Sequence, residues 1–446
     1  MKKWTLMLVT GFILLMPIQS VIAAEIGPTE WTQYRMNSEN NPVYNSDFNE
    51  EIRLNLPTND EIRSTPVIVG NRAYVGNHNT GGLFSFDLES GELLWENKAP
   101  NWIHSEMIYA EGQLFVGYGN RFFQDDGTRG TGESGMLSLD PETGDILWDF
   151  QTKGEVMPTP AYDNGTVYIT TGDRHLYAID PKSGKEKWSL NLDSRVSMSS
   201  PNIKDGVLYV GGADPYAFYA VDLEEREIKW QQVFDQVTSG LDDVPAVIFN
   251  DQLVITTGVE SDEKHNHKIY AMDITTGDIV WEDSLGMGAM VDNNKSGAPI
   301  IYEDKVFVGS PITQKFYSYN AESGEKEWEY KSHVNKAPPV AENGVVYFTD
   351  TKGIVYGFDT ESGELLGQKT LGGKLAPSGP VLMNGHLIVG SQDSNVYVLP
   401  VKDILSNENE ELTNEQGVET NKWLLYGIPG LAVIGLLAFF MMRRKK

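Results

Sequence analysis

The segment LYAIDPKSGKEKW, residues 176–188, recurs with substitutions along most of the chain. Its first four residues are apolar or small and predict a β-strand. The Asp-Pro-Lys-Ser-Gly run predicts a short turn, because the Asp side chain accepts local amide hydrogen bonds and Gly adopts positive φ without strain. Trp188 then lies in a second strand, where its large ring packs between neighbouring sheets. Each copy is therefore predicted to form a β-hairpin.

Seven copies and a truncated eighth divide the chain into repeats. They are residues 83–95, 137–148, 176–188, 218–230, 269–281, 316–328, 355–367 and the short start 396–399. Two copies deviate, since Arg226 replaces the turn glycine of the fourth and Gly367 replaces the tryptophan of the seventh. A structural role, docking one repeat on the next, is predicted for Trp95, Trp148, Trp188, Trp230, Trp281 and Trp328.

A second pair of strands precedes each hairpin, with turns such as Asn164-Gly165 and Asn343-Gly344 between apolar runs. Four strands per repeat and eight repeats predict an all-β fold, an eight-bladed β-propeller. The eighth repeat lacks its outer strand, and the unused segment Ile52–Leu56 is predicted to supply it and close the ring. A solenoid is the alternative, and it would need capping repeats.

The two ends of the chain predict export and membrane attachment. A basic start, an apolar run and small residues near Ala24 are typical of a signal peptide. The uncharged run 422–442 has the length of a transmembrane helix, and four basic residues follow it. The predicted organisation is a signal peptide at 1–24, a lead-in at 25–47, the propeller at 48–400, an acidic stalk at 401–421, a transmembrane helix at 422–442 and a cytoplasmic basic tail at 443–446.

Composition narrows the classes of function. The 446 residues include 35 basic and 63 acidic ones, a formal net charge of −28, which repels nucleic acid. There is no cysteine, so a disulfide, a Cys-ligated metal and a thiol nucleophile are excluded. Together with the two ends, this predicts a single-pass cell-membrane protein of a Gram-positive bacterium, with a monomeric propeller on the extracellular side.

The repeat Tyr-Ala-apolar-Asp-x-x-(Thr/Ser)-Gly-x-x-x-Trp resembles the tryptophan-docking repeat of pyrroloquinoline-quinone-like (PQQ-like) propellers. The resemblance covers about residues 29–400 and includes the entry segment Trp31-Thr32-Gln33-Tyr34-Arg35. It implies a quinoprotein-like fold and two classes of function, the quinoprotein dehydrogenases and non-catalytic propellers such as the outer-membrane assembly lipoprotein. The dehydrogenases resemble one another in an adjacent cysteine pair, a calcium or lanthanide site and a catalytic Asp; this chain has no cysteine.

The loops that enter the first strand of each blade are expected to meet around the axis, where propellers often bind ligands. Mixed charges in that funnel suit a polar ligand or a cation, although a solvated rim is the alternative interpretation. The candidates are Arg63, His104, Glu106, Glu155, Arg195, Asp242, Asp243, Asp292, Asn293, Lys295, Lys336 and Lys374. Asp242, Asp243 and Asp292 carry the oxygen ligands that calcium prefers.

Four smaller features are each open to two interpretations. His265 and His267 share a strand face and could bind a metal, or lie in a polar loop. The insertion 124–135 is rich in Gly and carboxylates, which fits a calcium loop or a binding loop. Asn164-Gly165-Thr166 matches the glycosylation pattern or a turn. Trp102 and Tyr216 would stack on the rings of a sugar ligand if they were exposed.

No catalytic constellation is visible, and no catalytic residue or cofactor is predicted. We expect a cell-surface, membrane-tethered, non-catalytic propeller that binds a protein or a surface polymer as a scaffold. The alternative is an exported PQQ-dependent quinoprotein oxidoreductase that holds PQQ and calcium in the axial funnel.

Overall fold

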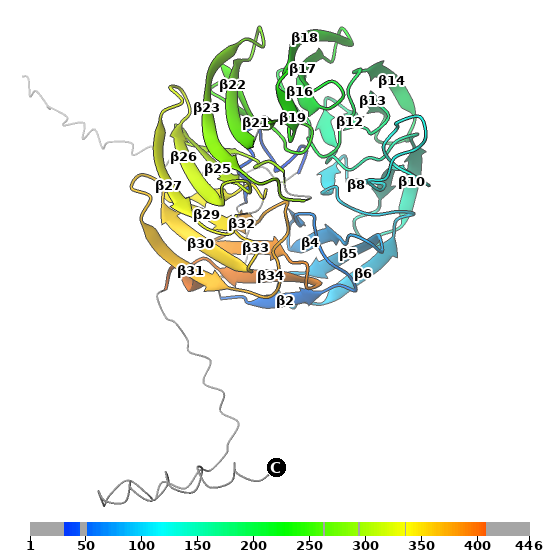
Figure 1. The fold of residues 1–446 in the computed structure, drawn as a ribbon. Helices are drawn as coiled ribbons and strands as arrows, with labels where there is room; N and C mark the ends of the chain where they lie inside the picture. Colours follow the sequence, from blue (N-terminus) through cyan, green and yellow to red (C-terminus); the bar gives the residue numbers. More distant parts are fainter. Residues whose placement is uncertain (1–30, 45–50, 262–263, 293–294, 335, 407–446) are drawn as a thin grey trace, which may run out of the picture. The chain divides into compact units, whose positions relative to one another are not determined.

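Eight β-sheets surround a common axis in the computed structural model (Figure 1). The structure describes residues 31–44, 51–261, 264–292, 295–334 and 336–406. Within each blade the consecutive strands run in chain order from the axis to the rim, and two sheets also include strands from elsewhere in the chain, β1 (Val43–Tyr44) and β2 (Leu54–Pro57) in one and β19 (Val237–Ser239) in the other. The predicted all-β, eight-bladed propeller is confirmed.

The first four blades are β3–β6 (Val67–Val69, Arg72–Gly76, Gly82–Asp87, Leu93–Lys98), β7–β10 (Ile108–Ala110, Gln113–Tyr118, Gly135–Leu139, Ile146–Gln151), β11–β14 (Ala161–Asp163, Thr166–Thr170, His175–Ile179, Glu186–Asn191) and β15–β18 (Asn202–Lys204, Val207–Gly212, Ala217–Asp222, Glu227–Val233). The last four are β20–β23 (Val247–Phe249, Leu253–Ser261, His265–Asp273, Ile279–Gly288), β24–β27 (Ile300–Tyr302, Lys305–Ser310, Lys315–Asn320, Lys326–Lys331), β28–β31 (Val340–Glu342, Val345–Thr349, Ile354–Asp359, Leu365–Thr370) and β32–β34 (Val381–Met383, His386–Gly390, Asn395–Pro400). Two short elements lie outside these sets. Strand β19 (Val237–Ser239), between β18 and β20, pairs with β21, and helix α1 (Lys402–Leu405) follows β34.

The ring closes by pairing the two ends of the propeller. Strand β2 (Leu54–Pro57) lies antiparallel to β34, with Leu54 opposite Val398 and Pro57 opposite Asn395. The predicted outer strand of blade eight is thus confirmed, and it begins at Leu54. Pairing removes the open edge that β34 would otherwise present.

In five of the blades the tryptophan of the repeated hairpin docks on the turn of the next blade. Trp148 donates its Nε1 hydrogen to the carbonyl of Pro181 at 2.9 Å, on the turn of blade three. Gly184 on that turn has φ +65°, and a Cβ there would lie 2.6 Å from the tryptophan ring. Glycine is required for both reasons, the positive φ and the contact with the ring. The same donation is made by Trp95, Trp230, Trp281 and Trp328 to the carbonyls of Pro141, Ile274, Ala321 and Thr360.

The two atypical repeats have separate structural solutions. Arg226 adopts φ +61° in the turn of blade four, the conformation that glycine takes elsewhere. In blade seven, helix α1 covers the place of the missing tryptophan. A Cβ on Gly367 would lie 2.2 Å from the carbonyl oxygen of Ile404, so the glycine admits the helix.

We expect Arg226→Gly to stabilise the protein by about 0.5–1 kcal/mol, because a non-glycine residue is strained at positive φ. Urea unfolding followed by tryptophan fluorescence measures the change. The control is Glu225→Gly, at the preceding residue, which lacks the positive φ and should lower the unfolding midpoint. An unchanged or lower midpoint for Arg226→Gly would contradict the strain.

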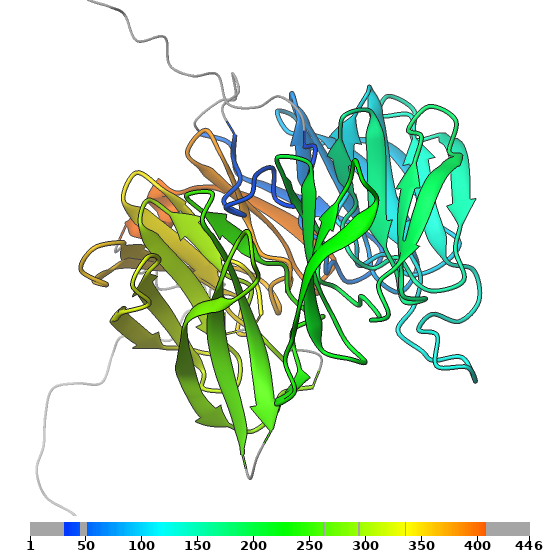
Figure 2. The same cartoon turned by 90° about the horizontal axis from the view of Figure 1, so that it is seen from above.

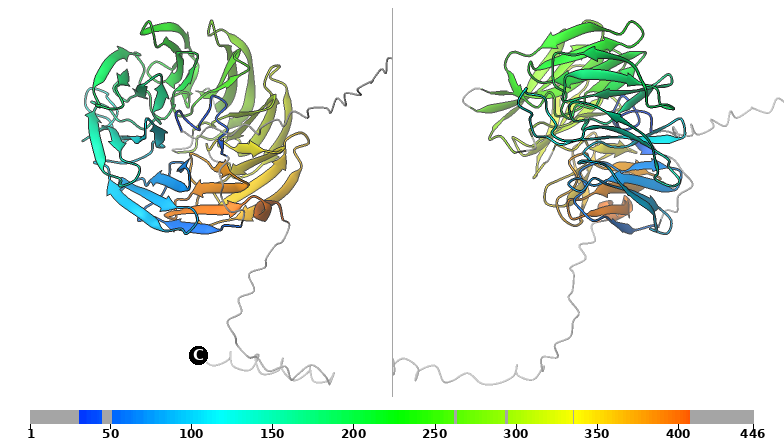
Figure 3. Two further views of the ribbon diagram at one scale, coloured as in Figure 1. Left: turned by 180° about the vertical axis from the view of Figure 1, so that it is seen from behind. Right: turned by 90° about the vertical axis from the view of Figure 1, so that its right-hand side faces the viewer.

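The lead-in lies inside the ring. Figure 2 shows it in dark blue at one face of the propeller, and Figure 3 shows it from behind at the centre. Its short strand β1 (Val43–Tyr44) runs parallel to β32. Its backbone carbonyls accept hydrogen bonds from the innermost strands of five blades; the pairs are Trp31 with Tyr109, Thr32 with Tyr162, Ser38 with Ile248, Glu39 with Ile301 and Pro42 with Leu382. The segment therefore ties these blades together and closes one end of the axial channel.

Arg35 anchors the lead-in. Its side chain is completely buried. The guanidinium donates to the carbonyls of Ser378 at 2.8 Å and Pro339 at 3.5 Å, and also to that of Pro380. One buried side chain thus joins the lead-in to the entries of blades seven and eight.

Several predicted segments lie outside the described residues. They are the signal peptide at 1–24, the transmembrane helix at 422–442, the basic tail at 443–446, and parts of the lead-in and the stalk. Within the described part of the chain, no helix has the length and apolar character needed to cross a membrane.

Candidate functional site

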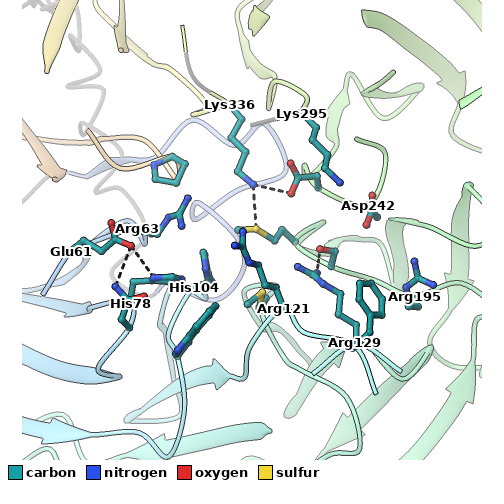
Figure 4. Close-up of a pocket in the computed structure, with 18 of the residues that line it drawn as sticks. Glu61, Arg63, His78, His104, Arg121, Arg129, Arg195, Asp242, Lys295 and Lys336 are labelled. Atoms are coloured by element: carbon teal, nitrogen blue, oxygen red, sulfur yellow. Dashed lines mark hydrogen bonds and ion pairs between the residues drawn. The ribbon is translucent and has the colours of Figure 1, made fainter. Parts of the chain in front are cut away.

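The loops that enter the innermost strands converge on the axis, at the end opposite the lead-in, and enclose a cavity of about 440 Å³ (Figure 4). Seven of the sequence-predicted residues line it: Arg63, His104, Arg195, Asp242, Asp243, Lys295 and Lys336. The other lining residues are Glu61, His78, Asn79, Trp102, Arg121, Phe123, Arg129, Met157, Ser197, Met198, Tyr216 and Pro377.

The remaining predicted residues lie elsewhere. Glu106 and Glu155 are buried and are not among the residues that line the cavity, although Glu155 contacts Arg129, which does. Asp292 and Lys374 are exposed and also lie outside its lining. Asn293 is outside the described residues. The predicted convergence of Asp292 with Asp242 and Asp243 is therefore not seen in this structure.

The floor of the cavity approaches the lead-in. A smaller cavity beneath it is lined by Tyr34 of the lead-in. The residues that line both spaces are His104, Met157, Met198, Asp243, Lys336 and Pro377, so the boundary toward the lead-in is partly apolar and partly charged.

Lys336 forms the main ion pair in the wall. Its Nζ lies 2.9 Å from Asp243 Oδ1 and 3.2 Å from Met198 Sδ, and the residue is 6% exposed. Burial lowers the pKa of Lys336, the carboxylate of Asp243 raises it, and the nearby guanidinium groups of Arg63 and Arg129 lower it further. Burial and the neighbouring Asp243 raise the pKa of Asp242.

Arg129 reaches the cavity from the insertion between β8 and β9. It donates from Nη1 to Glu155 Oε1 at 2.8 Å, and also to Ser197 Oγ. Glu155 is fully buried, and burial raises its pKa to about 8 in spite of the nearby Arg129. Burial thus weakens the ion pair between Glu155 and Arg129, because it favours the uncharged form of the carboxyl.

Two histidines and a tryptophan pack together on the opposite wall. The rings of His78 and His104 meet edge to face, with centroids 4.1 Å apart. His78 Nδ1 lies 3.0 Å from Glu61 Oε1. Burial nevertheless lowers the pKa of His78 to about 4, and it also lowers the pKa of His104. Trp102 contacts His78 at 4.8 Å between ring centroids and Phe122 at 5.4 Å. Both histidines are thus neutral at pH 7.

Aromatic residues form the rim of the cavity. Phe122 is 51% exposed and Phe123 is 56% exposed, although both are large and apolar. The guanidinium of Arg195 lies over the ring of Phe123, 5.1 Å from its centroid. Trp102 and Tyr216, which we expected to stack on a ligand if exposed, line the cavity.

Sequence reasoning missed the lining residues outside the entry loops. His78 lies between β4 and β5, and Arg121 and Arg129 lie in the insertion between β8 and β9. The length and the glycines of that insertion were a signal that it reaches toward the axis. Its carboxylates are used locally, since Asp126 pairs with Lys153 at 2.6 Å.

The predicted histidine pair of blade five is not available to a metal. His267 is fully buried, with Nδ1 at 2.7 Å from Ser310 Oγ and Nε2 at 3.0 Å from Ser296 Oγ. Both ring nitrogens are therefore occupied. Asn164 has φ +44° in the turn between β11 and β12, as the turn interpretation requires.

A family profile described as "Outer membrane protein assembly factor BamB" matches residues 20–133, 132–369 and 265–403, which together cover most of the chain. The chain belongs to this family. The resemblance to PQQ-like propellers is thus confirmed for the BamB-family protein described here.

Three characterised relatives have similar sequences. Tetrathionate hydrolase of Acidithiobacillus ferrooxidans is 24% identical over 78% of this chain and 66% of its own length, just under two thirds. Outer membrane protein assembly factor BamB of Yersinia pestis is 25% identical over 71% of this chain and 79% of its own, and that of Escherichia coli is 23% identical over 74% and 83%.

Solved structures share the fold of this BamB-family chain. BamB from Moraxella catarrhalis has a TM-score of 0.59 at 16% identity, covering 78% of this chain and 99% of the other. A europium-containing methanol dehydrogenase has a TM-score of 0.58 at 13% identity, covering 83% and 89%. A BamB structure and a dehydrogenase thus match the fold almost equally well, so the fold does not assign the function.

The predicted location is corrected by these relatives. We predicted a single-pass cell-membrane protein of a Gram-positive bacterium with an extracellular domain, but the BamB relatives are outer membrane proteins of the Gram-negative Yersinia pestis and Escherichia coli. The prediction rested on the two ends of the chain and on the absence of cysteine. Neither feature reports how many membranes the cell has.

The described residues do not fit calcium-bound PQQ. They contain no group of three or more His, Cys, Asp or Glu residues that could hold a metal ion. Of the three carboxylates in the lining, Asp243 is held by Lys336 and Glu61 lies 3.0 Å from His78 Nδ1. Trp102, the large ring in the wall, is already packed against His78 and Phe122 rather than open for a flat cofactor.

Proposed function

We propose that this BamB-family propeller is a non-catalytic binding module that holds a protein partner against the mouth of its axial cavity. The proposal rests on the aromatic and cationic rim described above. The named relatives that are assembly factors support a scaffold role, but they do not name a target for this chain.

The rim has the composition of a protein interface. Phe122 and Phe123 are adjacent and both more than half exposed, while scattered single apolar residues are the norm on a protein surface. Trp102, Tyr216 and Arg195 surround them, and tryptophan, tyrosine and arginine are the residues that most often dominate binding energy at interfaces.

The rim is also rigid before any partner binds. Asn120 Oδ1 accepts hydrogen bonds from the amides of Phe122 and Thr131, both at 3.1 Å. Gln124 Nε2 donates to the carbonyl of Lys153 at 2.9 Å. Because these bonds fix the loop in advance, the loop loses less conformational entropy when a partner docks, which favours affinity.

The quinoprotein oxidoreductase that we considered as the alternative has weaker support. Its fold matches, but the described residues contain no group of three or more His, Cys, Asp or Glu that could hold a metal ion. Dye-coupled oxidation of an alcohol or a sugar by the purified chain with PQQ and calcium would contradict our proposal. So would consumption of tetrathionate, the substrate named for the hydrolase relative.

We expect the double variant Phe122→Ser/Phe123→Ser to lower partner capture at least tenfold, because truncating two exposed aromatic anchors removes on the order of 2 kcal/mol or more. Capture is measured in cells that produce the full chain, by a photo-crosslinking amino acid placed at Arg121. The adduct is identified by mass spectrometry and tested for protease sensitivity.

The matched control is Leu147→Ser/Val280→Ser, which removes two similarly exposed apolar side chains from the outer strands β10 and β23. It should leave the adduct unchanged. Equal loss in both variants, or a protease-resistant polymer in the adduct, would contradict a protein partner at the rim.

A further inference from the structure

We propose that the axial cavity binds a compact polyanion, a small molecule that carries two or more phosphate, sulfonate or carboxylate groups. This goes beyond the proposed function, since the ligand would lie beneath the rim and would bind whether or not a partner is present.

The first observation is the local charge. Six cationic side chains line the cavity, those of Arg63, Arg121, Arg129, Arg195, Lys295 and Lys336. Three carboxylates line it, those of Glu61, Asp242 and Asp243. The whole chain has a formal net charge of −28, so the composition alone predicts the opposite balance. The cavity therefore concentrates positive charge within an acidic protein.

The second observation is that local ion pairs do not cancel this excess. Asp243 pairs with Lys336, and Asp214 outside the cavity pairs with Arg195. Glu155 pairs with Arg129 at 2.8 Å, and burial, which raises the pKa of Glu155 to about 8, weakens this pair by favouring the uncharged carboxyl. Among the described residues, no acceptor lies within hydrogen-bonding reach of the buried Nε of Arg63.

The third observation is mutual repulsion among the cations. Besides the effect of burial, the charge of Arg121 lowers the pKa of Arg63, and Arg63 with Arg129 lowers the pKa of Lys336. Figure 4 shows these side chains arriving from different sides of the axis. A bound anion would relieve the repulsion, and several cations around it would favour more than one negative charge.

The shape of the cavity favours a compact ligand. Its volume of about 440 Å³ lies in the range of small-molecule sites. Next to it lies a smaller cavity lined by Tyr34 of the lead-in, and the lead-in lies across that end of the channel, so a polymer cannot thread through. Six cationic side chains line this space, against one tryptophan and one tyrosine. Charge contacts would therefore be the main attraction for the ligand.

Titration calorimetry of the full-length protein at pH 7 tests this, with citrate and pyrophosphate as probes and sorbitol as an uncharged control. We expect saturable one-to-one binding of at least one anion, and none of sorbitol. Affinity should fall at least tenfold in the double variant Arg63→Gln/Lys295→Gln. The single variant Lys295→Gln should also bind more weakly, and because Lys295 is exposed, this change is the least able to disturb folding. Affinity should also fall as salt rises from about 0.05 M to about 0.5 M.

The control variant Arg226→Gln/Lys229→Gln removes two exposed cations from blade four and should bind like the wild type. No binding of either anion at low salt would overturn the proposal, as would equal loss in both double variants. Binding of an acidic peptide but of neither small anion would overturn a compact ligand. Retained anion binding in Phe122→Ser/Phe123→Ser shows that the cavity and the rim act separately, so either proposal can fail alone.

Discussion

Replacing Arg35 by methionine is expected to lower the free energy of unfolding by at least about 3 kcal/mol, because removing a buried charged donor leaves its acceptors without partners. Arg35 is fully buried and donates to carbonyls at the entries of blades seven and eight. Methionine keeps the length of the side chain and removes the donors. Urea unfolding followed by tryptophan fluorescence measures the loss.

Arg226→Met, on the exposed turn of blade four, is the control and should change the free energy of unfolding by less than about 1 kcal/mol. If Arg35→Met has an effect as small as this control, the lead-in is not a structural part of the ring. If it yields no folded protein, Arg35→Lys, which keeps one charged donor group, should recover part of the stability.

Raising the pH from about 6.5 to about 8.5 is expected to destabilise the protein by about 2 kcal/mol through Glu155 alone. Burial raises the pKa of Glu155 to about 8 and that of Glu106 to about 7, whereas an unfolded chain ionises both near pH 4.5. In this window the folded protein holds protons that the unfolded chain has already released. Stability therefore falls as the pH rises.

The window begins at pH 6.5 because the buried histidines have the opposite effect below it. Burial lowers the pKa of His78 to about 4 and that of His267 to about 3, so they are neutral when folded and charged when unfolded between those values and pH 6.5. Stability gained from the histidines rises most steeply below pH 6.5, where their unfolded forms are largely protonated, and levels off within about one pH unit above it. Above that range the slope reports the carboxyls.

Thermal unfolding at several pH values checks this. Glu155→Gln should flatten the profile between pH 6.5 and 8.5, and the exposed control Glu224→Gln should leave it unchanged. A wild-type profile that stays flat above pH 6.5, or a Glu155→Gln profile as steep as the wild type, would show that Glu155 is ionised in the folded protein.

The blades could be predicted because each carries its own local signals. The turn at Asp180, Ser183 and Gly184, followed by Trp188, specifies a hairpin without reference to the rest of the chain. Ring closure by β2 was predictable because a count of strands left one place empty. The course of the lead-in was not, since residues 31–44 have no periodicity and most of their partners lie far along the chain.

The cavity was predictable only in outline. Propeller topology brings the entry loops together, and seven of the named residues line the cavity. The direction of a side chain within a loop has no such rule, so Glu106 is buried outside the lining and Asp292 also lies outside it. His78, Arg121 and Arg129 come from other connections, whose reach toward the axis depends on their folded shape.

Closing the ring with β2 also constrains the order in which the chain folds. Synthesis proceeds from the N-terminus, so Leu54–Pro57 emerges long before its partner Asn395–Val398 exists. Joining strands so far apart in sequence is a slow step, since the entropy of closing the loop is lost before the pairing is gained. Seven blades can form locally while the eighth waits. The newly made chain must therefore pass through an open ring with exposed sheet edges, the stage at which it is most prone to aggregate.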